Sequence, residues 1–302
     1  ACCAANWATA GCVPTSPTSS PGNGTGSGMP HAAHPAGPGP VDSGPAVPGT
    51  TVPGAVVLGG DAPGIAEVRA VAAGAPVEFA PAVAELLARS RAVVEDHLRD
   101  GVAVYGLNRE LGAGRNIAVS TVDDAEVAAF QRRIVRNHNA AVGEPLPPGQ
   151  VRAILFARLA GFTRGGSGVR PELAEFYREL LNRGVLPVVR RTGSVGAADL
   201  VQLAAIAAVV IGEGEATLDG RTVPGAVALA AAGLEPLPLA AHEGLAVMSS
   251  NAYSSGIGAL VVGDLADVLP TADLTVALSL AALAPFVYAI KSLAHDGVTL
   301  PG

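Results

Sequence analysis

Cysteines and aromatic residues are scarce in this chain of 302 residues, and each shortage excludes a class of structure. The cysteines Cys2, Cys3 and Cys12 all lie near the beginning of the sequence. A disulfide framework or a cysteine-based metal site in the core is therefore excluded. Aromatic residues make up only 4%, so alanine, valine and leucine must fill the core. Such small side chains favour closely packed helices, because the helix axes can approach one another.

The chain also has fewer basic than acidic residues, and it has no long apolar run. The formal net charge is -7 and no basic stripe could neutralise phosphates, so we expect no nucleic-acid partner. The longest apolar stretch, residues 274–290, falls short of the ~20 residues that span a bilayer. We expect it to form a buried core helix, and we expect no membrane partner. The N-terminus lacks the positive region and the apolar run of a secretion signal, which favours a cytoplasmic protein.

Residues 1–54 differ in composition from the rest of the chain. They are rich in proline, glycine, serine and threonine, and Asp42 is their only charged residue. Such a segment buries too little apolar surface to offset the entropy of ordering it, which predicts a disordered leader before a folded domain at residues 55–302. His31 and His34 lie in this leader without further ligands, so we expect no metal site.

Helical periodicity dominates the remaining sequence, which predicts a mainly α fold with a few short strands. Residues 199–211 are apolar nearly all round, as in a helix buried on every side, and Asp199 is a natural N-cap for it. An Asp-Gly pair within residues 213–224 predicts a hairpin, and residues 55–60 a short strand. The other predicted helices are residues 81–101, 121–141, 150–162 and 172–182, with further helices beginning near residues 225, 251 and 272.

Six segments follow one another in an order typical of a single enzyme family. They are VYGLN (104–108), NHNAAVGEPLP (137–147), GGSGVRPE (165–172), GSVGAADL (193–200), IGEGEA (211–216) and HEGLAVMSSNAYS (242–254). Each resembles a motif of the histidine and aromatic amino-acid ammonia-lyases and aminomutases. The chain is identified as a member of this family, with its N-terminal and central portion only.

The resemblance implies a fold, a partner and an assembly. The fold would be the helical bundle of the ammonia-lyases, which is fumarase/aspartase-like, here truncated and with a small α+β N-terminal part. The ligand would be a small-molecule amino acid, and family members assemble as homotetramers. Without the second half of the family domain, we expect apolar faces such as residues 274–283 to lack partners, which predicts poor solubility or a non-native oligomer.

The resemblance also implies an electrophile made from the chain itself, with no external cofactor. Family members cyclise an Ala-Ser-Gly tripeptide into methylidene-imidazolone, called MIO. Here the segment reads Ala197, Ala198, Asp199, which is one residue shorter and has no serine. Alanine has no hydroxyl to lose as water, so we expect the MIO group to be absent. Ser194 is a poor substitute, because the attacking nitrogen would belong to the β-branched Val195.

Other family positions are kept. By resemblance, Tyr105 is the catalytic tyrosine and Asn251 the asparagine that contacts the electrophile. Asn137 and His138 fall at the pair that selects the substrate side chain in histidine and some tyrosine enzymes, and Gly112 lies in the loop that covers the substrate. A buried structural tyrosine, a helix N-cap and a structural histidine are the alternatives for Tyr105, Asn251 and His138.

Three functions remain open from the sequence. The first is an ammonia-lyase or aminomutase that acts on histidine or tyrosine and forms an α,β-unsaturated acid. The second is a catalytically silent homologue or fragment, since the serine of the electrophile is missing. The third is an MIO-free enzyme that uses the same pocket, because Arg109-Glu110-Leu111-Gly112 stands where the family has Thr-Gly-Phe-Gly.

Overall fold

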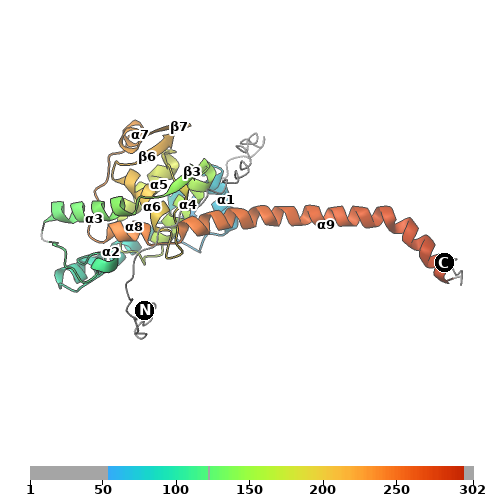
Figure 1. Ribbon diagram of the computed structural model, residues 1–302, viewed down its shortest axis with the longest axis horizontal. Helices are drawn as coiled ribbons and strands as arrows, with labels where there is room; N and C mark the ends of the chain where they lie inside the picture. The colour runs from blue at the N-terminus through green and yellow to red at the C-terminus, as the bar shows by residue number, and fades with distance from the viewer. Residues whose placement is uncertain (1–53, 122, 296–302) are drawn as a thin grey trace, which may run out of the picture. The chain divides into compact units, whose positions relative to one another are not determined.

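The computed structural model describes residues 54–121 and 123–295. The predicted leader, with His31 and His34, lies outside these residues except for Gly54. Within the described part the chain is mainly helical, as predicted (Figure 1). The longer helices are α1 (Ile65–Ala72), α2 (Ala82–Arg99), α3 (Asp124–His138), α4 (Pro148–Phe162), α5 (Pro171–Asn182), α6 (Leu200–Val210), α7 (Gly225–Ala231), α8 (Glu243–Met248) and α9 (Ala252–His295), and a short 3-10 helix covers Gly112–Gly114.

Short strands form three small sheets. Strand β1 (Val56–Leu58) pairs in parallel with β2 (Val77–Phe79), and β3 (Val142–Pro145) pairs antiparallel with β5 (Arg190–Thr192). The third sheet has the order β4-β6-β7, formed by Leu186–Pro187, Glu215–Leu218 and Arg221–Pro224. The predicted hairpin is confirmed as β6 and β7. Its turn residues Asp219 and Gly220 both have positive φ, as a tight two-residue turn requires.

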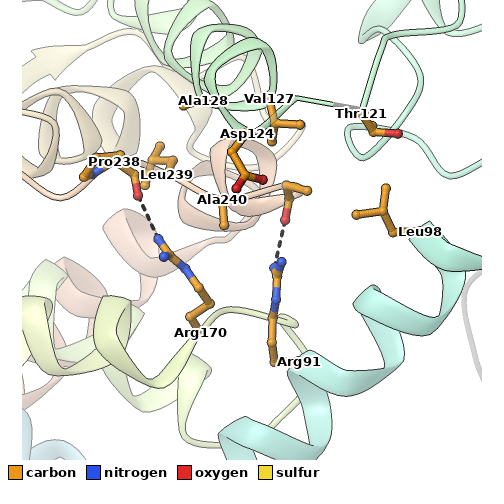
Figure 2. Close-up of a pocket in the computed structure, with 11 residues that line it drawn as sticks. Arg91, Leu98, Thr121, Asp124, Val127, Ala128, Arg170, Pro238, Leu239 and Ala240 are labelled. Carbon is orange, nitrogen blue, oxygen red and sulfur yellow. Dashed lines mark hydrogen bonds between the residues drawn. The ribbon is translucent and has the colours of Figure 1, made fainter.

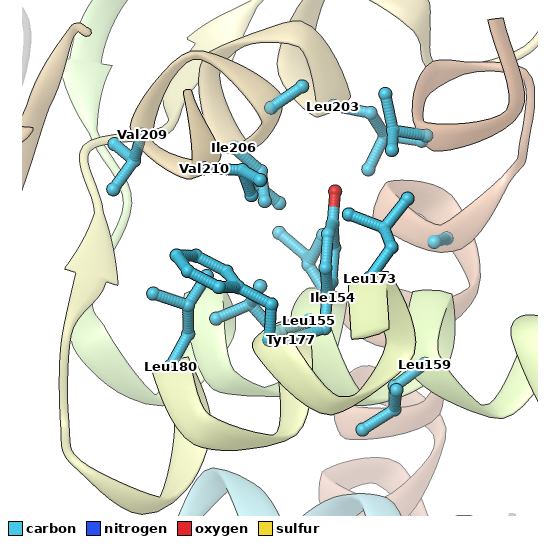
Figure 3. Close-up of a cluster of buried hydrophobic side chains, with 14 of the residues drawn as sticks. Ile154, Leu155, Leu159, Leu173, Tyr177, Leu180, Leu203, Ile206, Val209 and Val210 are labelled. Atoms are coloured by element: carbon cyan, nitrogen blue, oxygen red, sulfur yellow. The ribbon is translucent and has the colours of Figure 1, made fainter. Parts of the chain in front are cut away.

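The core is built around α4, α5 and α6 (Figure 3). Every residue of α6 from Gln202 to Val210 is buried, which confirms that this helix is surrounded on all sides. Phe162 of α4 packs edge-to-face on Tyr177 of α5, with ring centroids 5.1 Å apart. Fully burying such side chains contributes roughly 1.5–3 kcal/mol each. This core surrounds α6, and the segment directly before α6 carries the predicted electrophile position.

Helix α9 corrects two predictions. Residues 251 and 272 do not begin separate helices, because one helix of 44 residues continues through Pro270 and Pro285. Residues 274–290 are not a buried core helix in this chain, since Leu274, Leu280 and Phe286 are 59%, 63% and 72% exposed. An apolar sequence shows that a helix face suits burial, whereas burial itself needs a partner. By length and composition alone, a helical window within residues 243–286 could cross a membrane, a property that core helices of soluble proteins share.

The start of α9 is tightly packed. It lies against α4 and α1, and Gly256 allows the close approach. A Cβ atom at this position would lie 2.8 Å from the carbonyl carbon and oxygen of Ala153. Only glycine permits that distance, because no real Cβ comes so near to backbone atoms. The first turns of α9 are therefore held at a defined position beside α4.

Candidate functional site

The segment of residues 193–199 links β5 to α6. Its backbone turns sharply, with positive φ at Gly196 and at Ala198, where φ is 62°. A left-handed backbone is uncommon for alanine and indicates a conformation that the surroundings impose. The buried amide of Gln202 faces the start of the segment. With its oxygen turned inward, this amide accepts from the N–H groups of Gly193 and Ser194 at 3.2 and 3.1 Å.

Asp199 connects this segment to the beginning of α9. The prediction that its side chain caps α6 is wrong: the residue occupies the N-cap position of that helix, but its side chain makes no capping hydrogen bond there. The carboxylate instead accepts from the N–H and the hydroxyl of Ser254, both at 2.9 Å, and from the Ser194 hydroxyl at 3.2 Å. Because these donors hold the side chain toward α9, it is not available to the N–H groups of α6. The residue is 2% exposed.

Asn251 is brought next to the predicted electrophile position. The Asp199 N–H donates to the carbonyl of Ser250 at 2.9 Å, so Ala198, Asp199 and Asn251 meet at one place. Asn251 stands directly before α9, and its carbonyl accepts from the N–H of Ser255 at 2.8 Å. Its side chain is exposed and makes no hydrogen bond within the described part of the chain. The amide is therefore free to meet a ligand.

Tyr105 and Gly112 also lie together. The Tyr105 hydroxyl oxygen accepts from the Gly112 N–H at 2.8 Å. The Tyr105 side chain is 45% exposed, so the alternative of a buried structural tyrosine is wrong. Gly106, the next residue, has a positive φ and packs against Leu245 of α8. A Cβ atom at Gly106 would lie 2.7 Å from Leu245 Cδ2 and 2.9 Å from Leu245 Cβ, and together with the φ of 74° these contacts favour glycine.

His138 and Asn137 end helix α3. The half-buried His138 places Nδ1 2.8 Å from the carbonyl oxygen of Ile134, one helical turn earlier, whereas Asn137 is exposed. Within the described residues, no hydrogen bond joins this pair to Tyr105 or to the segment of residues 193–199. On the same helix, Arg136 forms a two-pronged ion pair with Glu213 at 2.7 and 2.8 Å. The end of α3 is thus anchored to the turn after α6.

A shallow cavity of about 430 Å³ opens beside Tyr105. Arg115 and Asn116, which the sequence interpretation missed, are part of its wall. The available signal was the glycine-rich stretch between residues 105 and 116, because it allows the chain to fold back toward the tyrosine. The lining residues are Ala103, Tyr105, Arg109, Arg115 and Asn116.

A second cavity, of about 290 Å³, lies between α2, α3 and residues 238–241 (Figure 2). Its two arginines serve the fold. Arg91 donates to the Ala241 carbonyl at 2.9 Å and pairs with Glu95 at 3.1 Å. Arg170 donates to the Pro238 carbonyl at 2.7 Å and pairs with the fully buried Glu243 at 2.9 Å. Both charges are compensated, and both guanidinium groups hold the segment that leads into α8.

The described part of the chain contains no cluster of side chains that could bind a metal ion. No group of three or more histidine, cysteine, aspartate or glutamate side chains gathers there in a way that could hold a metal ion. The contacts described above define the candidate site, which consists of the surface formed by residues 193–199 with Asn251 and of the loop that carries Tyr105.

Comparisons with known proteins agree with the six sequence motifs. Residues 64–301 match the family described as aromatic amino acid lyase. Histidine ammonia-lyase of Gloeobacter violaceus is 43% identical over 210 residues, which are 69% of this chain and 40% of that protein. The chain thus spans less than half the length of the curated relatives it matches.

Solved structures show the same fold. Ergothionase from Treponema denticola, an ergothioneine-degrading enzyme, matches with a TM-score of 0.68 and 30% identity, over 71% of this chain and 43% of that one. Tyrosine aminomutase from Streptomyces globisporus matches with a TM-score of 0.65 and 34% identity, over 69% and 39% of the two chains. The arrangement of helices described above is accordingly that of the ammonia-lyases and aminomutases.

Proposed function

Because this chain belongs to the aromatic amino acid lyase family, we propose that it carries an ammonia-lyase site for histidine, with tyrosine as the next candidate substrate. The reaction eliminates ammonia from the α-amino acid and leaves an α,β-unsaturated acid. The observation that carries this proposal is the 43% identity with a histidine ammonia-lyase. In keeping with it, we also propose a folded domain at residues 55–302, a cytoplasmic location and assembly as a homotetramer.

We propose a separate role in this reaction for each predicted site residue. Tyr105, once its phenol has lost its own proton to solvent, would take the proton from the β-carbon as a phenolate; the Gly112 N–H donates to its oxygen, and the residue is 45% exposed. The free amide of Asn251 would contact the reacting amine beside residues 197–199. His138 and Asn137, at the end of α3, would receive the side chain of the substrate.

The MIO group of the family does not fit the residues present. Its formation needs a side chain that loses water, and neither Ala197 nor Ala198 has one. The nearby Ser194 hydroxyl donates a hydrogen bond to the Asp199 carboxylate. Cyclisation at Ser194 would also require attack by the nitrogen of Val195, whose β-branched side chain hinders it. This disagreement favours a second candidate function, a catalytically silent homologue that keeps an amino-acid site.

One experiment separates the two candidates. The purified chain is incubated with L-histidine, and urocanate is followed by its ultraviolet absorption together with released ammonia. Product from the unchanged chain supports the ammonia-lyase. Binding of histidine without product supports the silent homologue, and absence of both binding and product contradicts both candidates.

A restored variant tests whether the short segment is the cause. Ala198 is replaced by a Ser-Gly dipeptide, which recreates the tripeptide of the family. Loss of two water molecules in the intact mass of this variant, with a gain of urocanate formation, would show that residues 197–199 alone separate the two functions. The matched control carries an Ala-Gly dipeptide at the same place and should lose no water.

A further inference from the structure

A third cavity, of about 190 Å³, lies where the end of α2 meets the start of α8. In the described part of the chain, it shares no lining residue with the cavity beside Tyr105 or with the cavity between α2 and α3. Its lining residues are Val93, Val94, His97, Val104, Leu107 and His242. None of them has a role in the proposed reaction, so this α2 cavity lies outside the candidate site.

The wall of the α2 cavity is mostly aliphatic. Three valines and a leucine form it, together with the imidazole rings of two histidines. Leu107 is 1% exposed, whereas Val93 is 54% exposed and so lies at the opening. A dry apolar cavity of about 150 Å³ is large enough to bind benzene, so this volume suits a single ring with one small substituent.

Packing within the chain fixes the wall. A Cβ atom at Gly168 would lie 2.4 Å from Val94 Cγ2 and 3.8 Å from His242 Cδ2, so both side chains border this glycine. On the loop, the Leu107 N–H donates to the Val104 carbonyl at 3.2 Å. The cavity is therefore formed before a ligand arrives, which reduces the entropy that binding would cost.

The imidazole of His242 brings an unpaired polar atom to this wall. Its Nδ1 is buried and has no hydrogen-bond partner among the described residues. Burial lowers the pKa of His242 and Arg91 lowers it further, whereas Glu243 opposes the shift, which favours the neutral ring. A hydroxyl group both donates and accepts, so it can pair with either tautomer of a neutral imidazole. His97 differs, because its Nδ1 lies 2.7 Å from the Val93 carbonyl oxygen, within hydrogen-bond distance.

We propose that the α2 cavity binds a small neutral phenol, with its ring among the aliphatic side chains and its hydroxyl paired with the imidazole of His242. Burial of the ring removes apolar surface from water. Among the described residues, no arginine, lysine, aspartate or glutamate lines the cavity, so a charged ligand would lose its hydration without gaining a partner. Because Val104 and Leu107 stand on either side of Tyr105 in the chain, a bound phenol would also stabilise the loop of the candidate site.

Isothermal titration of the purified chain with phenol, toluene and benzoate tests this site. Phenol should bind at least as tightly as toluene, although toluene is the more apolar molecule, because only the hydroxyl finds a hydrogen-bond partner. Benzoate should bind at least about tenfold more weakly than phenol, since its charge would be buried without a partner.

Two substitutions locate the ligand. Val93→Trp places a larger side chain at the opening and should weaken phenol binding at least about tenfold. His242→Asn removes the imidazole and should lower the preference for phenol over toluene about threefold or more.

Val227→Trp is the matched control, because Val227 of α7 is also 54% exposed and does not line the α2 cavity. It should bind phenol like the unchanged chain. Thermal unfolding of each variant, followed by circular dichroism, reports whether the fold persists. A Val93→Trp chain that unfolds early is replaced by Val93→Phe.

The outcomes distinguish this site from the proposed function, because phenol binding is first measured without an amino acid. Phenol binding that persists in Val93→Trp overturns the α2 cavity as its location. Displacement of phenol by L-histidine or L-tyrosine also overturns it, since the phenol would then occupy the substrate site, and it supports the proposed function. Absence of phenol binding, or toluene bound at least about tenfold more tightly, overturns a phenol as the ligand and leaves the proposed function standing.

Discussion

At the scale of single residues, Asp199 shows how one carboxylate can tie a loop to a helix. It is buried, and its three hydrogen bonds reach Ser194 in its own loop and Ser254 in the first turn of α9. An acidic group near a helix N-terminus also interacts favourably with the helix dipole. The shape of residues 193–199 and the start of α9 are consequently coupled.

Replacement of Asp199 by alanine should lower the free energy of unfolding by about 2 kcal/mol, because the Ser254 N–H in the first turn of α9 and the hydroxyls of Ser254 and Ser194 lose their acceptor. Urea denaturation measures the change. Asp61 is exposed and makes no side-chain hydrogen bond within the described residues, so Asp61→Ala should change stability by less than about 0.5 kcal/mol. Equal effects of the two substitutions would show that the Asp199 contacts do not stabilise the fold.

His242 should make stability depend on pH. Burial lowers its pKa from the ordinary value and the Arg91 guanidinium lowers it further, whereas Glu243 opposes the shift. As the pH falls below about 6.5, the unfolded chain binds a proton at this histidine that the folded chain does not bind. The free energy of unfolding contributed by His242 is therefore present above that pH and is lost as the pH falls toward the lowered pKa.

The substitution His242→Asn tests this dependence. Asparagine tolerates the left-handed backbone found here, where φ is 76°. Between about pH 7.5 and about pH 5.5, the unchanged chain should lose more unfolding free energy than His242→Asn. Identical slopes for the unchanged chain and His242→Asn would rule out the role of His242.

At the scale of elements, Arg152 of α4 joins three parts of the chain. Its guanidinium donates to the carbonyl of Val71 in α1 at 2.6 Å, of Leu181 in α5 at 2.8 Å and of Ala75 at 3.0 Å. Val71 and Leu181 lie near the C-terminal ends of their helices, where carbonyl groups lack partners within the helix. Burial lowers the pKa of Arg152, and these carbonyls satisfy its N–H donors.

The substitution Arg152→Met should destabilise the fold by about 3 kcal/mol, because three buried carbonyl groups lose a charged donor. Arg152→Lys should recover only part of this, since an ammonium group cannot reach all three acceptors at once. Arg89 of α2 forms an exposed ion pair with Glu85, so Arg89→Met should cost less than about 1 kcal/mol. Chemical denaturation of the three variants checks the order, and a loss for Arg152→Met no larger than for Arg89→Met would refute it.

At the scale of the whole molecule, the apolar surface of α9 should control solubility and self-association. Leu278, Leu280 and Leu283 are 62%, 63% and 55% exposed. They belong to a long apolar stretch of α9, and exposed apolar surface of this kind marks association surfaces. Replacing the three leucines by glutamine should shift sedimentation toward smaller species while the melting temperature stays the same, because these side chains bury little surface within the chain.

A matched control isolates the contribution of α9. Val57 of β1 is 58% exposed, which is close to the exposure of the three leucines. Val57→Gln should leave the sedimentation profile unchanged at every protein concentration. If the triple leucine variant also sediments like the unchanged chain, α9 does not mediate the association.

Sequence by itself determined the fold class, the family and the principal helices and hairpin. Residues 81–101 and 199–211 have apolar residues at helical spacing or throughout, and α2 and α6 occupy these positions. Residues 213–224 hold an Asp-Gly turn between two strand-forming runs, and β6 and β7 form there. Such patterns are local, so the sequence displays them directly. The roles of Tyr105, Asn251 and His138 remain predictions.

Tertiary structure alone decided which side chains meet. Asp199 was expected to cap its own helix, yet its partner Ser254 lies 55 residues further along the chain. Residues 274–290 were expected in the core, yet Leu274, Leu280 and Phe286 among them are exposed, because burial depends on what packs against a helix. Strands β3 and β5 pair across a long sequence separation, and so do the carbonyl groups that gather around Arg152. Long-range contacts of this kind follow from the path of the whole chain, which local periodicity does not contain.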